Sequence, residues 1–474
     1  MIKKLQKFRD GKFIALLKRG LSSKYFPFIS AAVTLLCYYL SWDMALIYYI
    51  TIVGVLILLL LDDLTPLVSV MLFFGIFGSY NNSPSLVMEE SDYYFQTANI
   101  VQIFILMTVF VVTGLYKIGL TVARKRFTLT PAFWGLCALS AALLFNGLFI
   151  VNYQAKNMLF GLLIAACFLI LFCLLKDNVK LDGAGYEKIA FAFIAFGTTL
   201  IIELVVKYLT ADDLFIDGSF NRNILRFGWG IWNTAGLWLT MCIPAALYLA
   251  YKKRLGFLFH IYALILFIAV CMTLSRQSIV VAAIIYLIGV IVLIVKGRYR
   301  IVNIILFAVA ATAVVAVLIV LRETAIKIIK ETVNDLLSYG GLKGNTRLLL
   351  WKQAIDNYRF APLFGKGFFG SFSKPSNSGL GFIPYMAHNT FLQLLSSCGT
   401  VGFIVYIVHR VQTVQLFCKK ITVDRTFIAL TILPILLMGL ADNHIFNVFP
   451  TIIYSSLLGI LAGDTLKNYE KPSA

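Results

Sequence analysis

The sequence predicts an all-α polytopic membrane protein, because the chain is too apolar for a soluble fold and its apolar residues fall into segments of membrane length. Of its 474 residues, 60% are hydrophobic and only 13% are charged, against about half and about a quarter in a typical soluble domain. The mean hydropathy is +0.88. This composition excludes a soluble enzyme, a disordered chain and a nucleic-acid-binding protein, despite a net charge of +19.

Fourteen segments approach the roughly 20 mainly apolar residues that a transmembrane helix needs. We predict these spans at 26–41, 44–61, 64–79, 98–116, 131–151, 157–175, 188–207, 232–250, 256–274, 278–295, 301–321, 389–408, 426–441 and 446–464. The chain then divides into a basic N-terminal segment (1–25), eleven spans (26–321) with a loop at 208–231, a long loop (322–388), three spans (389–464) and a tail (465–474). An even number of spans places both chain ends on one side.

The distribution of basic residues orients these spans. With the N-terminus in the cytoplasm, the cytoplasmic segments carry 27 Lys and Arg, whereas the short outside loops carry 5. Cytoplasmic loops of membrane proteins are enriched in Lys and Arg, and long loops are largely exempt from this rule. We therefore predict that both termini are cytoplasmic, with the long loop outside, and that the positive charge reflects topology and contact with anionic lipid headgroups.

The long loop, 322–388, contains two amphipathic helical patterns. Apolar residues recur at helical spacing between 326 and 337. The second pattern places these residues on one face: Leu348, Trp351, Ile355 and Tyr358. Asn345 or Thr346 is suited to cap the second helix, which puts Arg347 in its first turn. We expect both helices to lie on the membrane surface or over the bundle.

Several arginines stand outside against the topological bias, which makes them candidates for binding an anionic ligand. Arg276 lies in a very short hairpin between two apolar spans, where a charge is costly and usually functional. Arg222 and Arg226 precede Trp232 and Asn233, so cations lie near an aromatic ring suited to stacking on a sugar. Interfacial tryptophans are also common without any ligand.

Arg347 is a candidate diphosphate contact, because a helix N-terminus offers free N–H groups and a partial positive charge. A solvated surface arginine is the alternative. Gly365-Lys366-Gly367-Phe368-Phe369-Gly370 has the spacing of a dinucleotide-binding motif, but it follows no strand and lies outside the cell. Two interpretations of Gly365 and Gly367 stay open, a loop where the backbone approaches a ligand and an aromatic-packed turn.

His388 stands where the long loop joins the twelfth span. An imidazole titrates near neutral pH and can accept a proton from an attacking hydroxyl, although a lone interfacial histidine is more often structural. Asp442 and His444 follow a late span on the same side and are candidate partners. Asp212 and Asp213 are adjacent acids, which alone are weak evidence for a hard-cation site, so we predict neither a metal nor another cofactor.

Taken in order, these pieces resemble the O-antigen ligase and polysaccharide polymerase family, the Wzy/WaaL-type membrane glycosyltransferases. The matching pieces are Asn233-Thr234-Ala235-Gly236, Leu274-Ser275-Arg276, Arg347 with Trp351, Pro362-Leu363-Phe364-Gly365-Lys366-Gly367, and His388-Asn389. They lie between 222 and 410, about two fifths of the chain. Many members carry an acidic residue near Ser397, which this chain lacks.

The resemblance implies a C-type membrane glycosyltransferase fold and a metal-independent, inverting transfer from an undecaprenyl-diphosphate-linked glycan. It implies catalytic roles for His388, Arg276 and Arg347. The residues that we expect to bind substrate are Arg222, Arg226, Trp232, Asn233, Trp351, Gly365, Gly367, Asn389, Asp442 and His444. Cations in a water-poor site can stabilise a departing diphosphate by several kcal/mol, and arginine holds phosphate bidentately.

The first functional hypothesis is a polymerase of lipid-linked repeat units, acting on the outer face of a bacterial cytoplasmic membrane. A ligase that moves finished glycan to another acceptor is the nearest alternative, and a lipid-linked oligosaccharide flippase is an alternative of another class. The expected partners are a lipid-linked oligosaccharide donor and acceptor, membrane lipid and, as a candidate, a chain-length regulator protein. We expect no nucleic acid.

Overall fold

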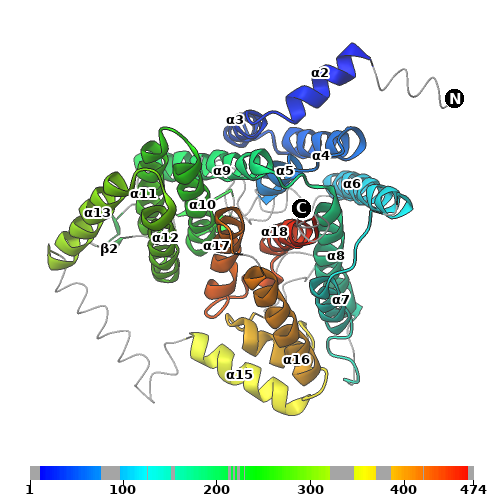
Figure 1. The fold of residues 1–474 in the computed structure, drawn as a ribbon. Helices are drawn as coiled ribbons and strands as arrows, with labels where there is room; N and C mark the ends of the chain where they lie inside the picture. The colour runs from blue at the N-terminus through cyan, green and yellow to red at the C-terminus, as the bar shows by residue number, and fades with distance from the viewer. Residues whose placement is uncertain are drawn as a thin grey trace.

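The computed structural model describes residues 11–75, 97–124, 126–150, 155–211, 215–216, 219–220, 225–228, 230–320, 346–369, 386–419 and 421–467. These residues form an assembly of α-helices with two short antiparallel β-hairpins (Figure 1). The helices are α2 (Lys12–Leu21), α3 (Phe26–Tyr39), α4 (Asp43–Leu60), α5 (Leu67–Phe74), α6 (Thr97–Ala123), α7 (Pro131–Leu144), α8 (Ala155–Asn178), α9 (Gly183–Thr210), α10 (Trp232–Lys252), α11 (Gly256–Met272), α12 (Arg276–Lys296), α13 (Arg300–Val320), α15 (Thr346–Phe360), α16 (Thr390–Cys418), α17 (Val423–Met438), η5 (His444–Phe446) and α18 (Val448–Lys467). The hairpins pair β1 (Phe215–Ile216) with β2 (Ser219–Phe220) and β3 (Arg226–Phe227) with β4 (Gly230–Ile231).

An α-helix coincides with each of the fourteen predicted spans, and this confirms the all-helical polytopic architecture. Among the described residues, six helices are long and apolar enough to cross a membrane, and six shorter helices are apolar. The number of crossings and their orientation stay predictions. Several boundaries differ from the prediction: the helix predicted for 131–151 ends at Leu144, because the chain turns through Gly147 at φ +71°, whereas α6 and α16 continue past their predicted ends.

The N-terminal basic segment contains a helix, α2, that was not predicted. Ile14 and Leu21 are buried, whereas Phe13 and Leu16 are 71% and 68% exposed. A helix of ten residues is marginal in water, so this pattern fits a helix lying on an apolar surface. Figure 1 shows α2 extending from the bundle beside α3 and α4.

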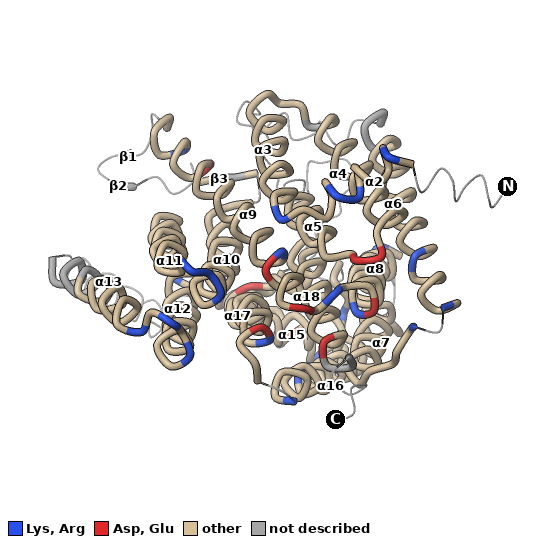
Figure 2. The backbone as a smooth tube through the Cα atoms, turned by 45° about the horizontal axis from the view of Figure 1, so that its top comes forward, with Lys and Arg blue, Asp and Glu red and all other residues tan. Residues whose placement is uncertain are grey.

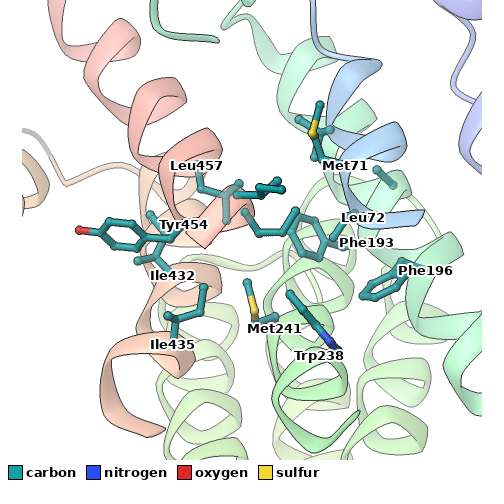
Figure 3. Close-up of a cluster of buried hydrophobic side chains, with 14 of the residues drawn as sticks. Met71, Leu72, Phe193, Phe196, Trp238, Met241, Ile432, Ile435, Tyr454 and Leu457 are labelled. Carbon is teal, nitrogen blue, oxygen red and sulfur yellow. The ribbon is translucent and has the colours of Figure 1, made fainter. Parts of the chain in front are cut away.

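The core surrounds α10, which is buried at every residue from Ala235 to Ala250. Its Trp238 and Met241 lie in a cluster with Phe193 and Phe196 of α9 (Figure 3). Met71 and Leu72 of α5, Ile432 and Ile435 of α17, and Tyr454 and Leu457 of α18 complete that cluster. Helices of this kind associate by close packing rather than by a hydrophobic drive.

Three helices that carry predicted site residues begin at the same end of the bundle. A hydrogen bond between Ser275 and Asn233 joins the starts of α12 and α10. The start of α16 contacts the end of α17, where the Thr390 N–H donates to the Gly439 carbonyl at 2.8 Å. Many of the acidic and basic residues of α8, α10, α17 and α18 lie at the opposite helix ends (Figure 2). The site therefore lies at the end where helix N-termini gather.

Candidate functional site

Helix α16 begins with a strained backbone. His388 has φ +49°, in the left-handed region that non-glycine residues rarely adopt. Directly after it, the Asn389 side chain caps the helix by accepting from the N–H groups of Phe391 and Leu392, both at 3.0 Å. The Asn389 amide also donates to the Leu440 carbonyl at 2.8 Å. Backbone strain of this kind persists where the surroundings enforce it, and it gathers at functional sites.

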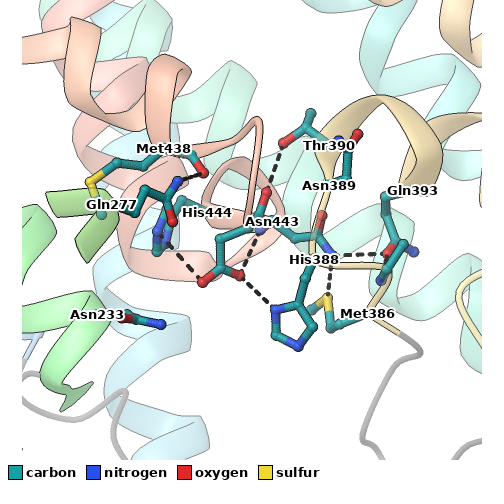
Figure 4. A network of polar contacts seen from close by, with 12 residues as sticks. Asn233, Gln277, Met386, His388, Asn389, Thr390, Gln393, Met438, Asn443 and His444 are labelled. Carbon is teal, nitrogen blue, oxygen red and sulfur yellow. Dashed lines mark hydrogen bonds and ion pairs between the residues drawn. The ribbon is translucent and has the colours of Figure 1, made fainter. Parts of the chain in front are cut away.

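The Asp442 carboxylate contacts the imidazoles of His388 and His444, which Figure 4 labels. His388 Nδ1 is 3.1 Å from Asp442 Oδ1, and His444 Nε2 is 3.8 Å from Asp442 Oδ2. The side chain of His388 is 41% exposed, whereas Asp442 is 15% and His444 1% exposed. A buried carboxylate therefore orients an imidazole that stays open to a ligand.

The electrostatics favour an ionised carboxylate beside a neutral buried imidazole. Burial alone would raise the pKa of Asp442, but His444 and His388, with the backbone N–H of Asn443, together hold it below its usual value. Burial lowers the pKa of His444, and the charge of Asp442 opposes this shift only in part. Neither ring nitrogen of His444 has a hydrogen-bond partner among the described residues.

A network of amide side chains holds His388, Asp442 and His444, here called the triad, in place. The Asn443 amide donates to Gln393 Oε1 at 3.0 Å, and the Ala387 N–H donates to the same oxygen at 2.7 Å. The Thr390 hydroxyl donates to the Asp442 carbonyl at 3.3 Å. The segment with Asp442 is thus fixed against the start of α16 on both sides of His388 (Figure 4).

The start of α12 adjoins the same network. Ser275 caps this helix and donates through its hydroxyl to Asn233 Oδ1 at 2.9 Å. Gln277 donates to the Met438 carbonyl at the end of α17, close to the Asp442 segment (Figure 4). Arg276 is therefore the first residue of a helix that is tied to the triad, and it is exposed.

Helix α15 confirms that the second predicted segment of the long loop is a helix, and it runs parallel to the first part of α16. Ala354 packs with Ala387, and further along Asn357 donates to Ser396 Oγ at 3.1 Å. The start of α15, with Arg347 in its first turn, therefore lies at the same end as His388. The packed face is centred on Ala354, one residue from the predicted stripe, and Ile355 of that stripe is 42% exposed.

Trp351 belongs to the same helix and is half-buried. Its indole Nε1 is buried without a hydrogen-bond partner among the described residues. A buried indole N–H usually finds an acceptor, so this group is suited to donate to a ligand or to water.

The glycines of the 365–370 motif let backbone approach protein rather than open space. Gly365 has φ +67°, and a Cβ there would lie 2.3 Å from the Ser397 carbonyl carbon. Gly367 has φ +83°, and a Cβ there would lie 2.4 Å from Asn157 Nδ2. The Phe369 N–H donates to Asn157 Oδ1 at 2.9 Å. These contacts explain both glycines by packing, while their predicted role in substrate binding stays untested.

The loop at 208–231 is described only in part. Arg222, Asp212 and Asp213 lie outside the described residues, and Arg226 is described only as backbone in β3. The first helix predicted in the long loop, at 326–337, also lies outside them. Among the residues that the structure describes, no cluster of His, Cys, Asp and Glu is arranged to hold a metal ion.

One buried carboxylate supports this loop. Glu203 in α9 is fully buried, and its Oε1 accepts from the Gly228 N–H at 2.6 Å. Gly228 lies in the turn between β3 and β4, shortly before Trp232 at the start of α10. Glu203 therefore holds the segment that leads into Trp232 and Asn233.

Two polar residues of the network were not predicted from the sequence, whereas Asn443 was expected to act with Asp442 and His444. Gln277 directly follows Arg276, and Gln393 lies one helical turn after Asn389. Each lies next to or one turn from a residue that was predicted. Neighbouring amides near predicted charged residues are the signal that would have found them.

Comparison with known proteins agrees with the resemblance drawn from the motifs. A family model described as O-antigen ligase matches residues 261–407, from within α11 to within α16. The matched region contains Arg276, Arg347 and His388, whereas Asp442 and His444 follow it. No curated protein matches the sequence. This match supports the resemblance of residues 261–407 to the O-antigen ligase and polysaccharide polymerase family.

Proposed function

We propose that this protein transfers a glycan from a polyprenyl diphosphate carrier to a sugar hydroxyl, with His388 as the general base. The observation that carries the proposal is the contact of His388 Nδ1 with the buried Asp442 carboxylate. When Nδ1–H donates to Asp442, the lone pair of the ring lies on Nε2. Among the described residues, His388 Nε2 has no hydrogen-bond partner, so it is available to an acceptor hydroxyl.

The proposed reaction is a single displacement. Nε2 of His388 takes the proton of the acceptor hydroxyl as its oxygen attacks the anomeric carbon of the donor. The bond from that carbon to the diphosphate breaks from the opposite side, so the configuration inverts and the lipid diphosphate leaves with the electron pair. Asp442 stabilises the imidazolium that forms.

The departing diphosphate needs positive charge, which the helix starts supply. Arg276 and Arg347 lie in the first turns of α12 and α15, where N–H groups and the helix dipole already favour an anion. We propose that both guanidinium groups contact the diphosphate, with Arg222 or Arg226 as a further contact. Trp232, Asn233 and Trp351 line the sugar side of this proposed site.

We propose that the acceptor is a second lipid-linked repeat unit, which makes the protein a polymerase on the outer face of the cytoplasmic membrane. Transfer of a finished glycan to a different acceptor is the second candidate, and the match to a family model described as O-antigen ligase favours it. Purified protein given an undecaprenyl-diphosphate-linked repeat unit alone separates the two. A ladder of products supports the polymerase; transfer only after a second acceptor is added supports the ligase.

A flippase differs from both, because it moves the lipid-linked glycan without forming a bond. The same purified protein in vesicles distinguishes it, with product formation and lipid movement measured in parallel. We expect His388→Ala to abolish product formation. Intact product formation with reduced lipid movement would contradict the enzymatic proposal.

A further inference from the structure

A second site lies at the helix ends opposite His388. There α10, α12 and α17 line an open apolar groove. Pro244, Leu247, Tyr248 and Tyr251 of α10 line it, with Gly289, Val292 and Leu293 of α12 and Val423, Thr426, Phe427 and Leu430 of α17. The stretch from Pro244 to Tyr251 rises about 10 Å along the helix, so the groove is elongated along the bundle.

The mouth of the groove is polar. Tyr248 donates its hydroxyl to Asp424 Oδ1 at 2.6 Å, and Lys252 Nζ lies 2.9 Å from the same oxygen. The charge of Lys252 therefore neutralises the charge of Asp424. The groove thus runs from a charged rim into an apolar interior, as an amphiphilic ligand requires.

The loops that follow α10 and α12 at this end are basic. The loop after α10 carries Arg254, and the loop between α12 and α13 carries Lys296, Arg298 and Arg300. The two loops touch, because the Tyr299 hydroxyl donates to the Arg254 carbonyl. In the described part of the chain, no carboxylate lies within ion-pair distance of these four cations. Figure 2 shows basic segments at these ends of α10 and α12.

We propose that the groove binds an acyl chain of an anionic phospholipid, whose phosphate contacts the basic rim. An apolar groove with an uncompensated positive rim matches a ligand with an apolar tail and a negative head, and basic pockets between membrane helices bind such headgroups. The carrier lipid of the proposed reaction is a poorer fit, because its diphosphate is placed at the opposite helix ends, near His388.

Native mass spectrometry of the delipidated full chain in neutral detergent tests this proposal, with phosphatidylglycerol and phosphatidylcholine of equal chain length as probes. We expect at least tenfold preferential retention of one phosphatidylglycerol. Val292→Trp fills the groove and should abolish this retention. Val295→Trp, at a position 58% exposed on the same helix, is the matched control and should keep it.

Charge variants test the rim separately. Lys296→Gln with Arg298→Gln should remove the preference for phosphatidylglycerol, whereas Lys24→Gln with Lys180→Gln, the same charge loss elsewhere, should not. Glycerol phosphate should not compete, because it lacks the tail. Equal retention of both lipids, unchanged retention by Val292→Trp, or dimer formation through this face would each overturn the proposal.

A crosslinking measurement on the unmodified chain covers the case in which Val292→Trp does not fold. Phosphatidylglycerol with a diazirine in its acyl chain should label peptides that contain 244–251, 289–293 or 423–430. Labelling spread evenly over lipid-exposed helices such as α6 and α13 would also overturn the proposal.

Discussion

The two ends of the helix bundle use carboxylates in different ways. At the end distant from His388, acids pair with permanent cations: Arg425 Nη1 lies 2.9 Å from Asp464 Oδ2, Lys252 pairs with Asp424 and Lys253 with Glu187. At the His388 end, Asp442 contacts two imidazoles. Guanidinium and ammonium groups keep their charge at physiological pH, whereas imidazole gains and loses a proton there.

This difference separates stability from chemistry. The Arg425–Asp464 pair joins α17 to α18, and its side chains are only 3% and 11% exposed, so it acts on packing. His388 is far more exposed than its partner carboxylate and lies on a strained backbone. We therefore expect changes at the His388 end to affect mainly the rate of reaction, and changes at the opposite end to affect mainly the free energy of unfolding.

The largest effect is expected at His388. His388→Ala removes the proposed base, and general base catalysis contributes about 10²- to 10⁴-fold, so the rate of glycan transfer should fall by that factor. The thermal midpoint in detergent should change little, because the side chain is half-exposed. A variant that keeps full transfer activity while remaining folded would remove the basis of the proposed mechanism.

The opposite end should give the reverse result. Asp464→Asn leaves the buried Arg425 without its carboxylate, and breaking a buried ion pair in this way costs about 3–5 kcal/mol. Chemical denaturation in micelles measures the loss. Transfer activity per folded molecule should remain unchanged, and a specific loss of activity in the folded fraction would contradict the separation of the two ends.

An intermediate effect is expected for the arginines at the helix starts. Arg276→Lys and Arg347→Lys keep the charge but lose the bidentate geometry that a guanidinium offers to phosphate, so transfer should fall about tenfold or more in each. Arg359→Lys, at the exposed end of α15, is the matched control and should have no effect. Full activity in both test variants would exclude diphosphate clamping by these residues.

The sequence predicted the helices well because the membrane imposes a simple rule. In a membrane, the backbone N–H and C=O groups of an apolar run must form their hydrogen bonds within a helix. The fourteen helices could therefore be predicted without knowledge of their tertiary contacts. The exceptions follow from contacts. Helix α7 ends early where Gly147 packs against Gly367, and α16 extends past the predicted span and turns at Gly399, where φ is +65°.

The sequence predicted the ionisable residues of the candidate site but not the amide residues that support them. His388, Asp442 and His444 were recognisable because ionisable groups are rare in this chain. Gln393 and Gln277 were not recognisable, because an uncharged amide does not stand out in the sequence. What it contributes depends on which carbonyl or N–H group it contacts in the fold. The contact between His388 and Asp442 joins residues 54 positions apart, which a single sequence does not reveal.

The smallest expected effect is the response of stability to acid. The folded pKa of Asp442 is depressed, so the carboxylate stabilises the fold above its unfolded pKa of about 3.9, and this contribution is lost as pH falls through the folded value. The pKa of His444 is also lowered, so below about pH 6.5 the unfolded chain binds its proton first. Both groups make the unfolded state bind more protons, and stability should therefore decrease with acidification.

Unfolding midpoints of the wild type and of Asp442→Asn between pH 3 and 7 check this. The variant should lose the decrease below about pH 4 and keep the one caused by His444, whereas Asp356→Asn, at an exposed acid of α15, should follow the wild type throughout.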